Sequence, residues 1–170
     1  MVPPPSRGKL PDIWTVQMPL TDLVALNAVI PAFKVNNKKQ AIHELAAKAA
    51  QLTGQNERAI FEILLQREKL GSTGVGSGVA IPHGKLPKLA KLFGLFARLD
   101  RPIDFEALDA QPVDLIFLLL APESAGADHL KALARVARLL RDPEVARKLR
   151  DCRDAEALYA VLALQSVSAA

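Results

Sequence analysis

The chain has 170 residues, half of them hydrophobic and 24% charged, which excludes wholesale disorder and suits one folded domain. Lysine and arginine outnumber aspartate and glutamate by 22 to 18, and this mild excess of +4 does not by itself indicate a nucleic-acid binder. The single cysteine, Cys152, excludes an internal disulfide and fits a reducing compartment, and three histidines with one cysteine are too few for an ordinary zinc site.

The ends of the chain differ from its middle. Residues 1–18 are rich in proline and show no sustained periodicity, so they are predicted to be an N-terminal extension of a domain that covers residues 19–165, followed by a tail at 166–170. No secretory signal is recognisable, and the longest strongly apolar run, Leu115 to Ala121, is about a third of the roughly 20 residues that a membrane helix needs. We therefore expect a cytoplasmic protein with no membrane insertion.

Two helices are predicted in the first half of the domain. Asn37 and Asn56 are typical N-cap residues, and apolar residues follow each of them at helical spacing. The first helix is expected to run from residue 38 to 52 and to close at a Thr-Gly pair. The second is expected to end at Gly71, with Leu70 on its apolar side.

Three strands are predicted next. Residues 79–83 are expected to be short and extended, because Pro82 bars a helix and biases Ile81 toward the β region. Residues 92–99 and 113–120 are apolar on both alternating sets of positions, which is typical of strands buried on both faces.

The C-terminal third is predicted to be helical. Asp128 is the expected cap of the first of three helices, and its expected apolar stripe consists of Leu130, Leu133, Ala137 and Leu140. Asp142-Pro143 and Asp154-Ala155 are each typical of a cap followed by a first helical residue. Two helices, three strands and three helices predict an α/β (mixed α+β) fold, with one three-layer domain in which helices flank both faces of a small mixed β-sheet.

One segment is unlike a generic domain: residues 66–85 read QREKLGSTGVGSGVAIPHGK, with five glycines around hydroxyl residues, Arg67 before them and His83 after them. Glycines let backbone amides turn toward an anion, and hydroxyls add donors. The dinucleotide fingerprint and the P-loop both require glycine where this chain has Val79. The segment therefore suits a phosphate site without a nucleotide cradle, and no cofactor or metal is expected.

This segment, with RPIDFEALDAQPVDLIFLLLAPE and DHLKALARVARLLRD, resembles enzyme IIA of the bacterial phosphotransferase system, within the nitrogen-regulatory branch of the fructose/mannitol IIA superfamily. The resemblance implies that His83 accepts a phosphoryl group from an HPr-like carrier, as a tele-phosphohistidine intermediate. It also implies that Arg67 stabilises the phosphoryl group and that His129 supports it as a second histidine. Pro31 departs from the family pattern, because it interrupts the expected first strand.

The chemistry of these residue types agrees with the resemblance. A histidine with an ordinary pKa near about 6.5 is largely neutral at pH 7, so one ring nitrogen has a lone pair that can attack phosphorus. The planar fork of Arg67 can bind two phosphoryl oxygens. His129 follows the expected cap, where a helix N-terminus favours anions. Phosphoryl transfer depends mainly on positioning and charge neutralisation, so such a set needs no metal.

Structural interpretations stay open beside the functional ones. Arg67 is also typical of a helix-end charge, and His129 of a surface residue. Ser72 and Thr73 are assigned to a phosphate-binding loop, but they also suit a turn. The remaining polar residues are interpreted as solvated side chains without a role: His43, Glu68, Glu106, Asp109, Cys152 and the arginine series from Arg135 to Arg153.

Three functions follow. The leading hypothesis is a phosphoryl-accepting regulatory protein of the nitrogen phosphotransferase system, whose surface near His83 changes with phosphorylation and so regulates target proteins. The second is a fructose/mannitol-type sugar-transport IIA component that passes its phosphoryl group to a IIB domain. The third, a nucleic-acid-binding module, has no recognition motif to support it, and no nucleic acid is expected as a partner.

Overall fold

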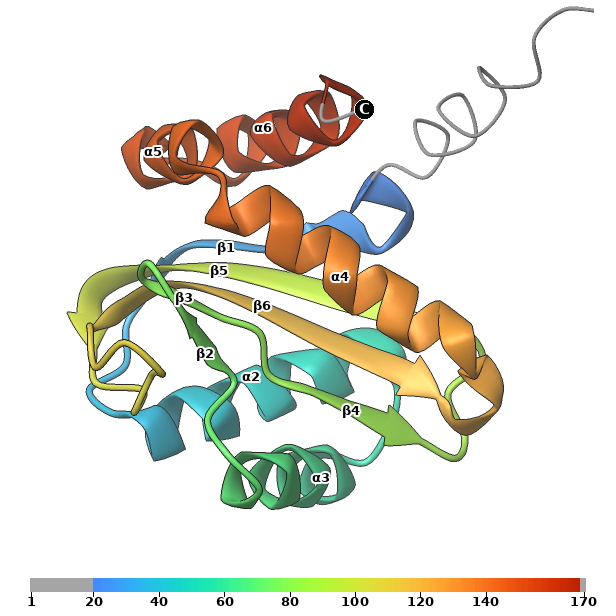
Figure 1. Ribbon diagram of the computed structural model, residues 1–170. Coiled ribbons are helices and arrows are strands. Elements are labelled where there is room, and N and C mark those ends of the chain that lie inside the picture. Colours follow the sequence, from blue (N-terminus) through green and yellow to red (C-terminus); the bar gives the residue numbers. More distant parts are fainter. Residues whose placement is uncertain (1–19, 169–170) are drawn as a thin grey trace, which may run out of the picture.

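The computed structural model describes residues 20–168, with side chains up to residue 164. The expected extension at 1–18 and the last two residues of the expected tail lie outside the described residues. Within them, the chain has the predicted three layers, with a six-stranded mixed sheet between two layers of helices. Helices α2 and α3 cover one face of the sheet, and α4, α5 and α6 lie over the other (Figure 1).

Helices α2, α3, α5 and α6 begin where the sequence predicts, and α4 begins before its expected cap, Asp128. Their bounds are Lys38–Thr53 for α2, Glu57–Lys69 for α3, Ala127–Arg141 for α4, Pro143–Asp151 for α5 and Ala155–Ser168 for α6, with short 3-10 turns at Leu20–Asp22 and Glu123–Ala125. The expected caps of α2, α3 and α5 accept hydrogen bonds from first-turn amides through the side chains of Asn37, Asn56 and Asp142. None of the helices in this part of the chain combines the length and the apolarity needed to cross a bilayer.

The sheet has the order β1-β5-β6-β3-β2, and β4 also pairs with β6. The strands are Val24–Phe33 (β1), Gly74–Gly76 (β2), Val79–Ala80 (β3), His83–Leu86 (β4), Phe93–Ile103 (β5) and Val113–Pro122 (β6). Strand β6 is antiparallel to β5 and parallel to β3 and β4, and its residues 115–120 are fully buried. It therefore forms the centre of the core, as its continuous apolar run predicts.

Pro82 divides one extended segment into β3 and β4. Val79 pairs with Leu115 of β6, and His83 resumes the pairing opposite Leu119. Pro82 has no N–H to donate, but its carbonyl accepts a hydrogen bond from the Leu119 amide at 3.0 Å. The backbone of His83 is thus held on the central strand while the chain bends just before it.

Helix α3 packs closely against the start of β4. A Cβ added at Gly84 would lie 2.3 Å from Cγ2 of Ile63, so only glycine allows this approach. Because Gly84 directly follows His83, the close contact brings the end of α3, and with it Arg67, to the His83 side chain.

Strand β1 passes through Pro31, which the sequence pattern treats as an interruption. The strand lies at the edge of the sheet, and its register with β5 is irregular between Ile30 and Phe33. An edge position tolerates a residue without an N–H. The Pro31 carbonyl instead accepts a hydrogen bond from Nη1 of Arg98 at 3.2 Å.

Two predicted apolar positions are wrong. Leu70 is 84% exposed and Leu130 is 67% exposed, so neither belongs to the core. The buried row of α4 consists of His129, Ala132, Val136, Leu139 and Leu140. This row is displaced by one position from the predicted stripe at its start, so that a histidine, not a leucine, faces inward.

Candidate functional site

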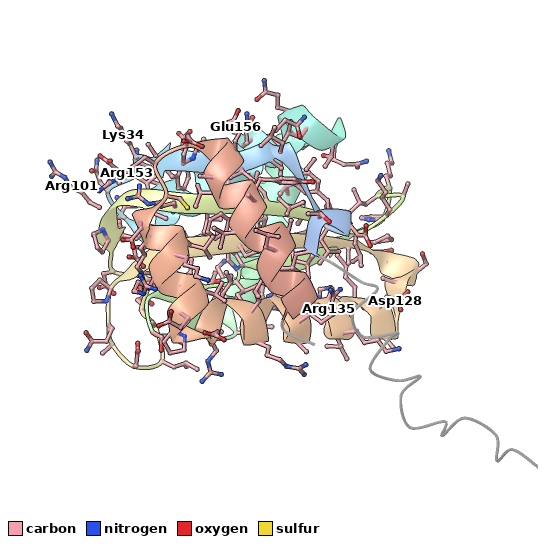
Figure 2. The ribbon with its side chains drawn as sticks, turned by 90° about the horizontal axis from the view of Figure 1, so that it is seen from above. Lys34, Arg101, Asp128, Arg135, Arg153 and Glu156 are labelled. Carbon is pink, nitrogen blue, oxygen red and sulfur yellow. The ribbon has the colours of Figure 1, made fainter. Side chains whose placement is uncertain are left out.

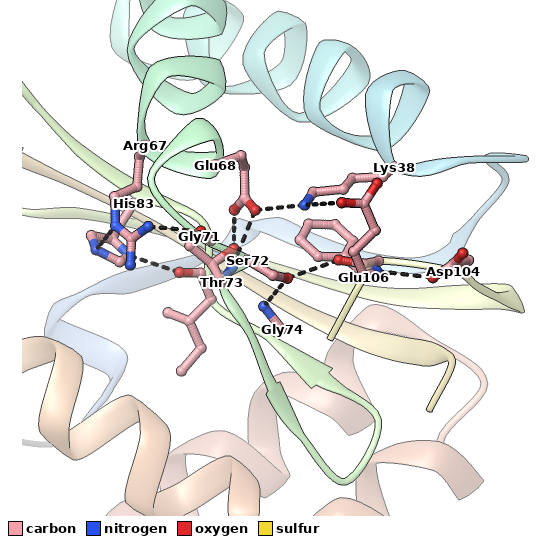
Figure 3. A network of polar contacts seen from close by, with 12 residues as sticks. Lys38, Arg67, Glu68, Gly71, Ser72, Thr73, Gly74, His83, Asp104 and Glu106 are labelled. Atoms are coloured by element: carbon pink, nitrogen blue, oxygen red, sulfur yellow. Dashed lines mark hydrogen bonds and ion pairs between the residues drawn. The ribbon is translucent and has the colours of Figure 1, made fainter. Parts of the chain in front are cut away.

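The His83 ring is held at both nitrogens. Its Nδ1 lies 2.8 Å from the carbonyl oxygen of Ile81, and its Nε2 lies 3.2 Å from Nε of Arg67 (Figure 3). A carbonyl only accepts, so Nδ1 carries the proton, and Nε2 presents its lone pair to the N–H of Arg67. This tautomer leaves Nε2 as the nucleophilic atom, which is the nitrogen that a tele-phosphohistidine requires.

Arg67 lies in the last turn of α3 and is oriented by a second contact. Its Nη1 donates a hydrogen bond to the carbonyl oxygen of Gly71 at 2.8 Å. The guanidinium is thus fixed between the loop after α3 and the His83 ring. Sequence reasoning left a solvated helix-end charge open for Arg67, but the structure places it against His83.

His129 lies in the first turn of α4, and its ring centroid is 5.6 Å from that of His83, with the two planes tilted by 52°. It is 7% exposed, so it is not a surface residue, and its Nδ1 is buried without a hydrogen-bond partner in the structure. Asp128 is not the cap as expected, because Gly126 occupies that position and no side chain caps the helix. An uncapped helix start and an unpartnered nitrogen therefore lie beside the His83 ring.

Ser72 and Thr73 make structural contacts within the loop. The Ser72 hydroxyl donates to the carbonyl oxygen of Phe105 at 2.8 Å and accepts from the Gly74 amide at 3.0 Å. The Thr73 amide donates to Oε2 of Glu68 at 3.1 Å, and its hydroxyl donates to Oε1 of the same carboxylate. The anion bound by this glycine- and hydroxyl-rich loop is therefore an internal carboxylate.

The prediction that Glu68 is a solvated surface charge is wrong. Its side chain is only 4% exposed and forms an ion pair with Nζ of Lys38 at 2.8 Å. The ammonium of Lys38 also lies 5.0 Å from the centroid of the Phe105 ring. Sequence reasoning missed Glu68 because its partner lies 30 residues earlier, at the start of another helix.

Three further side chains were predicted to be solvated, and one of them, Arg150, is held by an ion pair. Asp109 is exposed but accepts a hydrogen bond from the Ser77 amide at 2.9 Å. Arg150 is not simply solvated, because its Nε lies 2.8 Å from Oδ2 of Asp114 and its Nη2 donates to the Ser77 carbonyl. His43 is exposed, as predicted.

One group of basic side chains lies away from the site. Lys34, Arg101 and Arg153 lie at one end of the molecule, and Asp128 at the start of α4 lies at the other (Figure 2). His129 follows Asp128, so the histidine pair belongs to the end that lacks this basic group. Within residues 20–168, no cluster of three or more histidine, cysteine, aspartate or glutamate side chains is placed to hold a metal ion.

The pKa of His83 is lowered from its ordinary value of 6.5, chiefly by burial. The hydrogen bond to the Ile81 carbonyl opposes this, the charge of Arg67 lowers the pKa further, and the charge of Glu68 raises it. The pKa of His129 is also lowered, first by burial and then by the neighbouring His83 and Lys85. Both imidazoles are therefore neutral at pH 7, the state in which His83 can act as a nucleophile.

We expect the rate of phosphoryl acceptance by His83 to fall to half its plateau value only below pH 6.5. The reason is that only the neutral ring has a free lone pair at Nε2, and the folded pKa of His83 lies below 6.5. Single-turnover labelling across this range checks the rate, and an NMR titration of the His83 ring checks the pKa. A rate that halves at or above pH 6.5 together with the ring titration would contradict the prediction.

The same lowered pKa values affect stability. The unfolded chain binds more protons at these two histidines than the folded chain does, so their contribution is fully present above pH 6.5 and is lost as the pH falls through the folded pKa values.

The geometry suits transfer of an anionic group. A neutral ring nitrogen faces an arginine fork, and a second imidazole lies beside it at the start of a helix. An incoming phosphoryl group would meet one nucleophile and the N–H groups of the Arg67 guanidinium.

Comparisons with known proteins agree on one family. Residues 23–164 match the family model described as phosphoenolpyruvate-dependent sugar phosphotransferase system, EIIA 2. The chain is 76% identical, over 153 residues, to the nitrogen regulatory protein of Bradyrhizobium diazoefficiens, covering 90% of this chain and 100% of that protein. It is 46% identical over 130 residues to the nitrogen regulatory protein of Escherichia coli K12, covering 74% and 78% of the two chains. The crystal structure of nitrogen regulatory protein IIA-Ntr from Neisseria meningitidis is similar with a TM-score of 0.80 and 35% identity, over 84% of this chain and 98% of that one.

Proposed function

Because this chain belongs to the EIIA 2 family of the phosphoenolpyruvate-dependent sugar phosphotransferase system, we propose that it is a regulatory component that accepts a phosphoryl group on Nε2 of His83. The donor is an HPr-like phosphocarrier, and the phosphorylated and free forms bind target proteins differently. The observation that carries the proposal is the His83 tautomer, in which the Ile81 carbonyl holds the proton on Nδ1 and leaves the Nε2 lone pair facing Arg67.

In the proposed step, the Nε2 lone pair of His83 forms a bond to phosphorus as the bond from phosphorus to the donor's histidine nitrogen breaks. The electron pair of the broken bond stays on the donor ring. The Nδ1 proton stays on His83, where the Ile81 carbonyl stabilises the positive charge that develops on the ring. Arg67 then exchanges its contact with Nε2 for contacts with phosphoryl oxygens, and it keeps its hydrogen bond to Gly71.

The regulatory output is a change of charge on an exposed rim. A phosphoryl group adds a charge of about −1.5 to −2 beside His83. Leu70 follows Arg67 by three residues and Leu130 follows His129, and both are exposed. Apolar contacts from these two leucines would let a partner dock over the histidine and sense the added charge.

Reconstitution tests the proposal directly. The protein is incubated with phosphoenolpyruvate, enzyme I and an HPr-like protein, and its intact mass is measured before and after acid treatment. We expect one added phosphoryl group that acid removes and alkali does not, because a phosphoramidate is acid-labile. No mass increase under conditions that phosphorylate the HPr-like protein would refute the proposal.

The alternative is a sugar-transport role, which the wording of the matched family model favours. In that case the phosphorylated protein would pass its group to a fructose- or mannitol-type IIB domain. The name shared by the relatives from Bradyrhizobium diazoefficiens and Escherichia coli favours the regulatory role. Fast, complete transfer to a IIB domain would decide for transport, and retention of the label in its presence would decide for regulation.

His129→Gln is expected to slow phosphoryl acceptance and back-transfer by about tenfold or more, the effect of losing one hydrogen bond to a charged group. The physical reason is that the His129 ring lies 5.6 Å from the His83 ring, centroid to centroid, where it would contact a phosphoryl group on Nε2. Rates are measured from rapid-quench labelling, with thermal unfolding to monitor the fold. His43→Gln is the control, because the His43 side chain is 58% exposed and lies beside Glu57 at the start of α3, whereas Arg67 lies in the last turn of that helix. Equal rates for the two variants would leave a site built from His83 and Arg67.

A further inference from the structure

We infer that Glu68 is a positioning residue for phosphoryl transfer: with Lys38 as its counter-ion, its carboxylate holds the backbone connection that orients the His83 ring. The inference rests on the proposed role of His83 as phosphoryl acceptor. Glu68 itself touches neither the His83 ring nor, in this arrangement, the position of the phosphoryl group, so it acts through Thr73 and Ile81.

The Glu68 carboxylate binds Thr73 and Lys38. Both of its oxygens accept hydrogen bonds from Thr73, one from the amide and one from the hydroxyl, and Oε2 also lies 2.8 Å from Nζ of Lys38. The Glu68 side chain is 4% exposed and that of Lys38 is 15% exposed. The pair is therefore shielded from water, and it fixes the position of Thr73 from two sides.

Two hydrogen bonds through Ile81 connect Thr73 with the His83 ring. The Thr73 carbonyl accepts a hydrogen bond from the Ile81 amide at 2.9 Å, and the Ile81 carbonyl accepts the Nδ1 proton of His83 at 2.8 Å. The other ring nitrogen contacts Arg67, which directly precedes Glu68 in α3. Both nitrogens of His83 are thus linked to the last turn of α3: Nε2 directly through Arg67 (Figure 3), and Nδ1 through Ile81 and Thr73, in addition to the pairing of β3 and β4 with β6.

Stability alone does not account for the ion pair of Glu68 and Lys38. A buried ion pair costs desolvation energy, and apolar residues of similar shape are often equally stable or more so. A carboxylate at this point also occupies the Thr73 amide and hydroxyl, the donors that an anion would otherwise find in this loop.

The test compares Glu68→Gln with Glu106→Gln. The first keeps the shape of the side chain but removes the charge and one of its acceptors. The second removes a carboxylate that lies 4.0 Å from the same Lys38 ammonium, but whose side chain is 77% exposed. We expect Glu68→Gln to lower kcat for phosphoryl acceptance by about 10- to 100-fold, since small misplacement of a reacting group has effects of this size. KM for the HPr-like donor should stay unchanged, because Glu68 is buried away from the docking surface.

A second readout does not depend on phosphorylation. In ¹⁵N-histidine NMR spectra, the free wild-type protein should show His83 protonated at Nδ1. The Glu68→Gln variant should show a mixture of the two tautomers. Arg67, His129 and Lys85 are the same in both proteins, so the difference would come from Glu68. Glu106→Gln should keep the single tautomer. A merely structural role would change thermal unfolding but neither the tautomer nor kcat at constant KM.

A pair of variants at Lys38 keeps the inference testable even where Glu68→Gln does not fold. Lys38→Arg retains the ion pair and should keep kcat and the tautomer, whereas Lys38→Met should reproduce the loss. Wild-type kcat and tautomer in Glu68→Gln, or in a folded Lys38→Met, would overturn the inference. Failure of the wild-type protein to accept phosphoryl would refute the proposed function instead, and the NMR comparison would still decide whether Glu68 orients His83.

Discussion

Replacing His83 by alanine is expected to abolish acid-labile phosphorylation while the protein stays folded. The Nε2 atom of His83 is the nucleophile, and no neighbouring side chain takes its place: the His129 ring is buried, and Arg67 has no lone pair to offer. The loss should be complete within the detection limit of intact-mass measurement. His83 is only partly buried, so the unfolding midpoint should change little.

His43→Ala is the matched control for this prediction. It also removes a histidine ring, from the exposed side of α2, where the imidazole lies 4.0 Å from the Glu57 carboxylate. It should be labelled like the wild type. Labelling of His83→Ala at an undiminished rate, with the same acid lability, would contradict the assignment of the acceptor.

Arg67→Ala is expected to slow phosphoryl acceptance by about 10- to 150-fold, the equivalent of roughly 1.5 to 3 kcal/mol for a hydrogen bond to a charged group. Arg67 contacts Nε2 before transfer, and its fork is in place for two phosphoryl oxygens afterwards. The variant should also raise the pKa of His83, because the charge of Arg67 lowers it. Single-turnover labelling gives the rate, and an NMR titration gives the pKa.

Two further variants separate position from charge. Arg67→Lys keeps a positive charge without the planar fork, so its rate should fall between those of the wild type and Arg67→Ala. Arg58→Ala removes an arginine from the same helix whose side chain is 86% exposed and pairs with Glu62, and it should leave the rate unchanged. A wild-type rate in Arg67→Ala would return Arg67 to the role of a helix-end charge.

The helices were predictable because their signals are local. Asn37, Asn56 and Asp142 each lie directly before a helix and bind its first-turn amides, so cap and periodicity agree within a few residues. The long strands β5 and β6 were predictable for a similar reason, since their apolar runs are bounded by turn signals. The three-layer arrangement follows from elements of this kind in this order.

The parts that sequence reasoning missed depend on distant partners. Strand β2 has three residues, two of them glycines, and shows no periodicity; its pairing with β3 defines it. Leu130 and His129 are neighbours on one helix, and which of them faces inward depends on how α4 lies over the sheet. In the sequence, Glu68 looks like an ordinary charge near a helix end, because its ion-pair partner, Lys38 of α2, lies close to it only in the folded chain.

The candidate site was predictable to a different degree for each residue. His83 and Arg67 lie in one short motif, and the structure brings them together. His129 is 46 positions after His83, and only the family resemblance pointed to it, whereas the structure places the rings 5.6 Å apart. A role of the Ser72 and Thr73 hydroxyls as phosphate ligands remains a prediction. In the free protein, these hydroxyls donate to the Phe105 carbonyl and the Glu68 carboxylate.

The placement of Pro31 affects how copies of this protein meet at high concentration. Strand β1 is the long edge of the sheet, and an exposed edge of ten residues is ordinarily a template for pairing with a strand of another molecule. Pro31 has no N–H to donate, and the register of β1 with β5 is irregular between Ile30 and Phe33, so β1 is not a regular template. On the opposite side, β2 and β4 are three and four residues long, too short to template a second sheet. Within the described residues, pairing of sheet edges between copies at high concentration is therefore less favourable than it would be for long, regular edge strands.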